Sequence, residues 1–582
     1  MRSAHAGLLA PAMALLFFFL LLPLLVAVAI SLRLPAPDLH AYAELIGGTF
    51  RAILFGTVRD SATVAFGCLL LGLPASYAYV RLGSRYLPLI MLAVLVPYFT
   101  STLIRSYAWI AILGNQGLIN RALLGLGLVS APVKLAYTWF GMIVAMVQVQ
   151  LPLFIIPVLA VMHRCDPSLA RAAKTLGADP VTAFVTVYLP QIRPGLTAAV
   201  VMVFMTTLGF YVTPALLGPP STLFLSQSIE MRINTLSDQP GAAAQSIVLL
   251  ALTIIVAWLF FRPLRASLIP EEQDVVRGAT AERPLQVFAA ARTLQRCAEA
   301  LSPLRWPAFV GIAVLTTLLL IGPLLVLFPL SFSDAPYLSF PPASYSPRWY
   351  RIYLSDSDWM RATFLSLCLG LAGAAAATLS GGLAALAMAR MAPLLRIILL
   401  LVCAIPLIVP PMVLGTSVFY LAARLGWVGN PIILVGCYAL LSLPYATMVL
   451  TTALARFDWQ LPKAAATLGA SPAVALWTIV LPLILPSIAG AFIFSFFVGF
   501  DDVNVALFLA NPYDRPLPIV MLDDIRDTLN PRTASVAVIF FLTAVLLCAL
   551  QATAQRIHSY VALRRFELKK HKPVTSRIEV EA

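Results

Sequence analysis

The chain has 582 residues, of which 60% are hydrophobic and 11% are charged, and its mean hydropathy is +0.92. A soluble globular protein could not hide so much apolar surface from water, so the composition excludes that class and predicts an integral membrane protein. The formal net charge is +14.

Twelve uncharged runs are long enough to form membrane-spanning helices, each of which needs about 20 mostly apolar residues. The first run is too long for the apolar core of a secretory signal, and no small-residue cleavage site follows it, so we interpret it as a retained span. We therefore predict an all-α integral membrane protein with about twelve transmembrane helices. In chain order the runs cover residues 8–32, 62–80, 87–104, 135–162, 194–229, 239–261, 306–333, 362–389, 397–423, 425–455, 464–500 and 533–555.

A polar segment divides these runs into two groups of six. Residues 264–304 hold ten charged side chains, and we interpret them as a cytoplasmic linker. The first six-span half covers residues 1–263, the second covers 305–557, and residues 558–582 form a basic cytoplasmic tail. Because each half has an even number of spans, the halves are predicted to be parallel repeats with a transport pathway between them.

The distribution of Lys and Arg predicts the orientation in the membrane. With the N-terminus in the cytoplasm, 25 of the 39 basic residues and 11 of the 25 acidic residues fall on the cytoplasmic side. That side then carries the whole net charge, and both termini are cytoplasmic. The basic tail is expected to contact anionic membrane lipids, so no nucleic-acid partner is needed to explain the charge.

One polar loop between spans occurs twice. The loop at residues 166–195 recurs 292 positions later at residues 458–487, and 15 of the first 29 positions are identical without a gap. Asp-Pro and Ser-Pro pairs in these loops are signals for helix starts. Each copy is therefore expected to form two short helices with a break at Gly177 or Gly469, because glycine can end a helix without strain. Both copies are predicted to be cytoplasmic.

The first helix of each loop has one face of small apolar residues, which let another surface approach the backbone closely. For a single loop of this kind, packing against its own membrane domain would explain this face as well as docking of a partner would. Two copies at equivalent positions instead favour a docking surface for a partner with two-fold symmetry. The candidate docking residues are Ala172, Ala173 and Gly177 in the first copy, and Ala464, Ala465 and Gly469 in the second.

These loops resemble the EAA loop of ABC-type importer permeases, in which the loop forms a coupling helix that sits in a groove of a cytoplasmic ATPase. Four further segments resemble the spermidine/putrescine permeases of this family. Two in the first half are similar to their first subunit and two in the second half to their second subunit, so the chain resembles both subunits fused. The segments are LIRSYAWIAILGNQGLIN (103–120), FYVTPALLG (210–218), FPPASYSPRWY (340–350) and GFDDVNVALFLANP (499–512).

The resemblance implies the transmembrane permease component of an ATP-driven, binding-protein-dependent importer that works by alternating access. The solute would be a polyamine or another small charged compound, with phosphonate, iron, thiamine and opines left open. The implied partners are a cytoplasmic ABC ATPase dimer and a periplasmic or lipid-anchored solute-binding protein, and the location would be the bacterial cytoplasmic (inner) membrane. The chain has no Gly-Lys pair and hence no phosphate-binding loop. We therefore expect no cofactor on this chain, with ATP and Mg²⁺ on the ATPase.

The glutamate that gives the EAA loop its name is absent from both copies. Arg171 stands at its position in the first loop and Lys463 in the second. Replacing an acid by a base on a docking face reverses the charge that complements it. We therefore hypothesise that the groove of the partner presents a carboxylate to Arg171 or Lys463.

Asp501 and Asp502, at the outer end of the eleventh run, are the candidate residues for contact with the solute. Ionisable groups near a membrane interior are costly, and adjacent carboxylates suit a cationic solute. They are equally consistent with a helix cap or a receptor contact. Arg105 and Trp109, at the start of a predicted outer loop, suit either a receptor contact or anchoring at the membrane interface.

Neither a metal site nor a catalytic site is predicted. The five histidines and seven cysteines form no known ligand spacing, and no acid–base pair or nucleophile motif is found, so we expect a transport subunit and not an enzyme. The alternative is a twelve-span secondary transporter of the major facilitator kind. Its characteristic acidic loop would fall at residues 81–86, which contain no acid.

Overall fold

The computed structural model describes residues 2–83, 85–177, 180–268 and 305–543, together with residues 545, 546 and 553. Regular secondary structure in this part of the chain is helical, apart from an isolated β-bridge between Ser333 and Tyr345. The prediction of an all-α membrane protein is confirmed. The predicted linker lies outside the described residues from position 269 onward, and so does the tail.

The first half contains long apolar helices separated by short ones. In chain order these are α1 (Arg2–Leu16), η1 (Phe17–Leu21), α2 (Leu22–Ser31), α3 (His40–Glu44), α4 (Gly48–Leu82), α5 (Leu87–Phe99), α6 (Thr102–Leu113), α7 (Leu118–Gly125), α8 (Trp139–Met162), α9 (Pro167–Thr175), α10 (Pro180–Ala183), η2 (Phe184–Tyr188), α11 (Leu189–Leu208), α12 (Val212–Leu217), α13 (Leu225–Asn234) and α14 (Gln239–Leu268).

The second half repeats this order, and from α8 onward most equivalent helices start 292 positions apart. Its elements are α17 (Arg305–Ser331), α18 (Arg348–Ser355), α19 (Ser357–Met388), α20 (Pro393–Ala404), η4 (Ile405–Leu407), α21 (Pro411–Leu425), α22 (Pro431–Ala455), α23 (Gln460–Thr467), α24 (Pro472–Ala475), η5 (Leu476–Val480), α25 (Leu481–Phe500), α26 (Ala506–Leu509) and α27 (Leu517–Asp527). A further apolar helix runs from Arg532 to Thr543.

Nine helices of the described residues are long and apolar enough to cross a membrane, and two bent pairs bring the number to 11 if each is one span. The pairs are α5 with α6 and α7, bent by 99°, and α20 and η4 with α21, bent by 84°. The sequence runs at 87–104 and 397–423 were each predicted to form one span, and each corresponds to such a bent pair. The twelfth predicted run, 533–555, is described as a helix only as far as Thr543.

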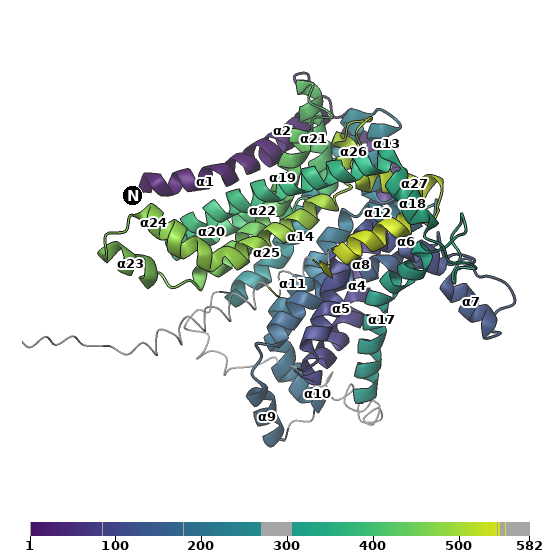
Figure 1. Cartoon of the computed structure of the whole chain (residues 1–582), viewed down its shortest axis with the longest axis horizontal. Helices are drawn as coiled ribbons and strands as arrows, with labels where there is room; N and C mark the ends of the chain where they lie inside the picture. Colours follow the sequence, from purple (N-terminus) through teal and green to yellow (C-terminus); the bar gives the residue numbers. More distant parts are fainter. Residues whose placement is uncertain are drawn as a thin grey trace, which may run out of the picture.

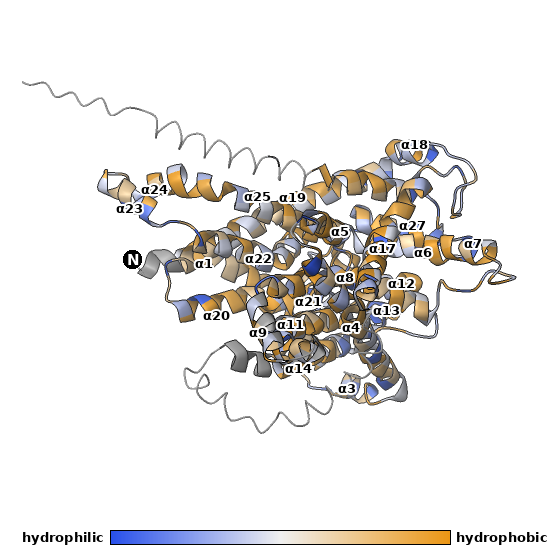
Figure 2. Cartoon of the chain, turned by 90° about the horizontal axis from the view of Figure 1, so that it is seen from below, coloured by the Kyte–Doolittle hydropathy of each residue, from blue (hydrophilic) through white to orange (hydrophobic). Residues whose placement is uncertain are grey.

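The two halves exchange their first helices. Helix α17 begins the second half but packs against α4, α5, α6 and α8 of the first, whereas α1 of the first half packs against α19 and α22 of the second. The halves are therefore interlocked. Large apolar side chains such as Phe66 and Phe364 remain exposed on the long helices, where a bilayer would cover them. Figure 2 shows this apolar character along the long helices.

The halves meet at one end and diverge at the other. In Figure 1, α12, α13, α26 and α27 lie together toward the upper right, while one arm carries α23 and α24 to the left and the other carries α9 and α10 downward. The two repeated loops therefore lie at the separated ends of the two arms. Hydrogen bonds between the halves are found at the end where they meet.

Candidate functional site: the repeated loops and a central cavity

Both repeated loops form the predicted pair of short helices, α9 with α10 and α23 with α24. Asp166 Oδ1 accepts a hydrogen bond from the Ser168 backbone N–H at 2.8 Å at the start of α9. In the second copy the Ser471 side chain accepts one from the Val474 N–H at 3.3 Å and caps α24. These side chains define where the short helices begin.

The helix breaks occur at the predicted glycines. Gly177 and Gly469 both have φ +87°, a left-handed backbone conformation that favours glycine. A Cβ added to either glycine would meet nothing within 4 Å, so the backbone angle and not crowding explains the residue. The same angle in both copies gives the two loops the same turn.

The loops present apolar side chains to their surroundings. Leu176 is 88% exposed, and Leu468, at the equivalent position, is 89% exposed. Both leucines belong to the apolar face that the sequence predicts for the first helix of each loop, but they were not among the candidate docking residues. Most of the predicted docking residues are at least partly exposed. The exposed ones are Ala172, Gly177, Lys463, Ala464 and Gly469, and the partly exposed ones are Ala173 and Ala465. Arg171 lies within α9.

Each loop continues directly into a span that leads to the centre of the molecule. The π-helical turns η2 and η5 join α10 to α11 and α24 to α25. Helix α11 ends at Leu208, beside Gly209, and α25 ends at Phe500, beside Asp501. A single span therefore connects each loop to the place where these two helices end.

A cavity of 560 Å³ lies at that place, between the two halves. Its walls come from α5, α6, α8, α11 and α12 of the first half and from α20, η4, α21, α22 and α25 of the second. The charged residues that line it are Arg105, Asp501 and Asp502. The structure thus places the predicted aspartates at the seam between the repeats, where a pathway was expected.

The two aspartates have different surroundings. Asp501 accepts a hydrogen bond at 3.2 Å from the Thr102 N–H of the other half, and its second carboxylate oxygen is buried without a hydrogen-bond partner among the described residues. Asp502 accepts bonds from the backbone N–H groups of Val505 at 2.9 Å and Ala506 at 3.3 Å. The helix-cap alternative thus describes Asp502, which caps α26.

The interpretations of Arg105 and Trp109 as residues of an outer loop are wrong. Each is 4% exposed, because all residues of α6 from Leu103 to Leu113 are buried between neighbouring helices. Arg105 donates to the Val149 carbonyl at 3.0 Å, and the Trp109 ring N–H donates to the Gln148 amide oxygen at 3.4 Å. Arg105 instead lines the central cavity.

One wall of the cavity is aromatic. Tyr445 and Phe494 have ring centroids 4.7 Å apart, Tyr98 lies 6.1 Å from Phe494, and Phe99 lies 5.6 Å from Phe497. Tyr98 and Phe99 belong to the first half and the other three to the second, so the rings close one seam. No sequence signal indicates this cluster, because its members are far apart along the chain.

Hydrogen bonds join the halves at the end away from the repeated loops. The Tyr107 hydroxyl donates to the Asn530 carbonyl at 2.7 Å, Arg526 donates to the Tyr211 hydroxyl at 2.8 Å, and the Tyr420 hydroxyl donates to the Gln239 carbonyl at 3.0 Å. The cavity is therefore bounded at this end by contacts between the repeats.

Comparison with known proteins agrees with this architecture. The family described as "binding-protein-dependent transport system inner membrane component" matches twice, at residues 64–263 and 377–559. The chain is 29% identical over 260 residues to the spermidine/putrescine transport system permease protein PotB of Haemophilus influenzae, covering 43% of this chain and 90% of that protein.

Two proteins of Escherichia coli (strain K12) are also similar. The spermidine/putrescine transport system permease protein PotB is 27% identical over 223 residues, covering 38% of this chain and 81% of that protein. The putrescine transport system permease protein PotI is 29% identical over 241 residues, covering 40% of this chain and 85% of that protein. Each relative is matched over most of its length by less than half of this chain, as expected for two repeats of that size in one polypeptide.

Proposed function

Because the chain belongs to the family of binding-protein-dependent transport system inner membrane components, we propose that it supplies both permease halves of one ATP-driven importer. It is an ABC importer permease with two repeats, and the family consists of transport subunits and not enzymes. The double family match leaves no reason to prefer a secondary transporter of the major facilitator kind.

The observation that carries this proposal is the pair of repeated loops. Two exposed helical turns with the same glycine angle and the same exposed leucine lie at the ends of the two diverging arms. The same exposed leucine at equivalent positions of both copies gives the two loops equivalent surfaces, as a partner with two-fold symmetry would require. An ATPase dimer with one groove per subunit would cover both, with ATP and Mg²⁺ bound on the dimer.

The divergence of the arms supports alternating access. The halves are joined at the end of α12, α13, α26 and α27 and separate at the end of the repeated loops (Figure 1). This arrangement corresponds to a state open toward the ATPase side. Closure of the ATPase dimer would draw the loops together and open the opposite end, where a periplasmic or lipid-anchored binding protein would deliver the solute.

The proposed solute is a polyamine or another small charged compound. The similar permeases are named for spermidine and putrescine. The acidic side chains in the central cavity are compatible with cationic compounds. The proposed location is the bacterial cytoplasmic membrane, with both termini cytoplasmic.

The proposal is tested with two double variants of the loops. Leu176→Asp with Leu468→Asp should prevent the ATPase from co-purifying and abolish ATP-dependent spermidine uptake into vesicles, because a charge cannot enter an apolar groove. Arg171→Glu with Lys463→Glu should weaken the same association if the groove offers carboxylates. The control is Leu126→Asp, since Leu126 is 73% exposed but lies outside the loops.

Uptake by the parent protein should continue when the proton gradient is dissipated and stop when the ATPase carries a mutation in its catalytic site. If both double variants retained the ATPase and full uptake, the proposed docking role of the loops would be wrong. If only the charge-reversed variant retained them, the carboxylate hypothesis alone would fail.

A further inference from the structure

A second, open cavity of 750 Å³ lies at the end of α8 opposite the first repeated loop. Three segments of the first half line it: the first part of α4, residues 134–139 before and at the start of α8, and residues 219–222 between α12 and α13. Helix α8 starts at Trp139 and leads at its other end to α9. The cavity is therefore distant from the repeated loops, and it shares no lining residue with the central cavity.

The charged residues that line this cavity are both basic. They are Arg59 and Lys134, and no acidic residue of the described chain lines it. The buried Asp60 holds Arg59 from behind, because its Oδ1 accepts hydrogen bonds from the Arg59 Nε at 2.8 Å and from the Trp139 ring N–H at 2.9 Å. The Asp60 side chain is 2% exposed and that of Arg59 is 48% exposed. Two positive charges against the one negative charge of Asp60 leave a net charge of +1.

Four hydrogen-bond donors of this cavity have no acceptor in the described part of the chain. The Arg59 guanidinium also lies 5.7 Å from the Trp139 ring centroid, so it is held in place while its Nη1 remains free to donate. The other three donors are the Lys134 ammonium group and the hydroxyls of Tyr137 and Ser221. The cavity therefore offers a cluster of donors and positive charge to an anion.

The second half of the chain does not repeat this chemistry. In the 292-residue register that relates the starts of α8 and α22, Lys134 corresponds to Gly426. Thr222, which also lines the cavity, corresponds to Asp514. The second half thus has no cation at the first position and an acid at the other. The basic cavity is a feature of the first half and not a consequence of the shared fold.

Tyr137 has a backbone conformation that favours glycine. Its φ is +57°, and the equivalent residue of the second half, Gly429, has φ +82°. A side chain other than glycine is strained in this left-handed region, and such strain is concentrated at functional sites. Because the fold accepts glycine at the equivalent turn, the shape of the turn does not explain the tyrosine. Its hydroxyl in the cavity gives the side chain a use.

The cavity lies beside a surface that a bilayer would cover. Arg59 shares one face of α4 with Phe66 and Leu70, seven and eleven positions later, which are 63% and 59% exposed. Phe140, next to Trp139 at the start of α8, is also 59% exposed. The uncharged run of α4 starts at residue 62, just after Arg59. The cavity is therefore at the level of the lipid headgroups, where Trp and Tyr side chains are common.

We propose that this cavity binds the phosphodiester group of an anionic phospholipid, in the leaflet away from the repeated loops. Guanidinium and ammonium groups bind phosphate oxygens strongly, and basic pockets between membrane helices bind anionic lipid headgroups. The single negative charge of phosphatidylglycerol matches the net charge of the cavity, and its acyl chains can lie against the exposed face of α4. An acidic side chain of a protein partner would match the charge but not this apolar surface. The inference goes beyond the proposed transport function and does not depend on it.

The test measures binding of phosphatidylglycerol to the delipidated full chain in detergent by native mass spectrometry. Lys134→Gln should weaken binding by about fivefold, because it removes one positive charge from the headgroup site. The variant should fold normally, since Lys134 is exposed and has no ion pair in the described part of the chain. Arg121→Gln is the matched control: Arg121 is exposed on α7, outside the cavity, and its loss should leave binding unchanged.

A second variant separates lipid binding from stability. Tyr137→Gly gives the first half the residue that the second half has at this turn. The melting temperature of the lipid-free protein should stay the same or rise, because glycine adopts the angle without strain. Binding of phosphatidylglycerol should weaken by about threefold through loss of the hydroxyl donor. A lower melting temperature with unchanged lipid binding would assign Tyr137 to the fold and contradict the inference.

Two competitors identify the bound group. Diacylglycerol, which has the acyl chains without the phosphate, should bind much more weakly than phosphatidylglycerol, and inorganic phosphate at the same concentration should not displace the lipid. Equal binding of diacylglycerol would show that only an apolar surface is present, and displacement by inorganic phosphate would assign the cavity to a soluble anion. Either result would overturn the inference, as would unchanged lipid binding in Lys134→Gln.

Discussion

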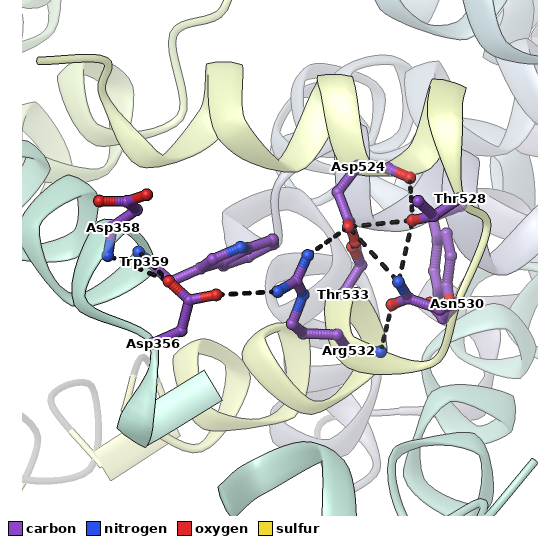
Figure 3. A network of polar contacts seen from close by, with 9 residues as sticks. Asp356, Asp358, Trp359, Asp524, Thr528, Asn530, Arg532 and Thr533 are labelled. Carbon is purple, nitrogen blue, oxygen red and sulfur yellow. Dashed lines mark hydrogen bonds and ion pairs between the residues drawn. The ribbon is translucent and has the colours of Figure 1, made fainter. Parts of the chain in front are cut away.

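At the scale of single residues, Arg532 illustrates how buried charges stabilise the end at which the halves meet. Arg532 donates to Asp524 at 2.6 Å and to Asp356 at 3.1 Å, and its guanidinium lies 4.4 Å from the Trp359 ring centroid (Figure 3). Asp356 also caps the start of α19, and the Asp524 side chain is 5% exposed. One arginine therefore connects α27 to the start of α19.

Replacing Arg532 with Met should lower the free energy of unfolding by about 3 kcal/mol or more, because Asp524 would remain as a buried charge without its cation. The control is Arg515→Met: Arg515 lies 2.6 Å from Asp523, but both side chains are more than one-third exposed, so the loss should be under about 1 kcal/mol. Melting temperatures of the two variants check this difference. Equal shifts in the melting temperatures of the two variants would show that burial of the Arg532 network adds nothing to stability.

At the scale of helices, the π-helical turns have a common cause in the sequence. Each of the turns η1, η2 and η5 is followed by a Leu-Pro pair, with the prolines at positions 23, 190 and 482. Proline has no N–H to donate to the carbonyl four residues earlier, and a π turn accommodates the missing bond. Two of the three turns join a repeated loop to the span that leads to the cavity.

The double variant Pro190→Ala and Pro482→Ala should convert both turns into regular α-helix. A π turn accommodates one more residue than a turn of α-helix, so winding the same residues as α-helix would rotate one side relative to the other by about 100°. The loops would then be misaligned with α11 and α25, so we expect less solute transported per ATP hydrolysed, with the ATPase still bound. Pro194→Ala with Pro486→Ala is the control, because these prolines lie inside the same helices beyond the turns. If the Pro190→Ala and Pro482→Ala variant transported as much solute per ATP hydrolysed as the parent protein, the π turns would have no coupling role.

At the scale of the whole molecule, the exchange of first helices makes each half incomplete without the other. Helix α17 lies against four helices of the first half, and α1 lies against two of the second. These contacts are between residues that are distant in sequence, and they do not depend on the segment between positions 268 and 305. The association of the halves should therefore survive a break in that segment.

Co-expression of residues 1–268 and 305–582 as separate chains should yield a complex that co-purifies through a tag on either one. Deleting α17, residues 305–331, from the second chain should abolish co-purification, because the first half would lose the helix that covers α4, α5 and α8. Co-purification of the chain without α17 would show that the remaining seam is sufficient for assembly.

Much of the fold was predictable because it depends on local sequence. Apolar runs predicted the spans, and the repeat predicted two loops with breaks at Gly177 and Gly469, both of which have the left-handed angle. The breaks after Phe99 and before Pro411 were missed, because an apolar run has the same composition whether its helix is straight or bent. The interpretation of Arg105 and Trp109 as outer-loop residues was wrong because α6, to which both belong, is buried among neighbouring helices.

The sequence by itself determined the membrane class, the two repeats and the position of the repeated loops, since hydropathy, glycine and proline act within a few residues. Only the tertiary structure decided which residues line the central cavity and which half each first helix covers. The Thr102 N–H reaches Asp501 across 399 positions of sequence. No local pattern specifies such a contact, because it depends on how the two halves pack against each other.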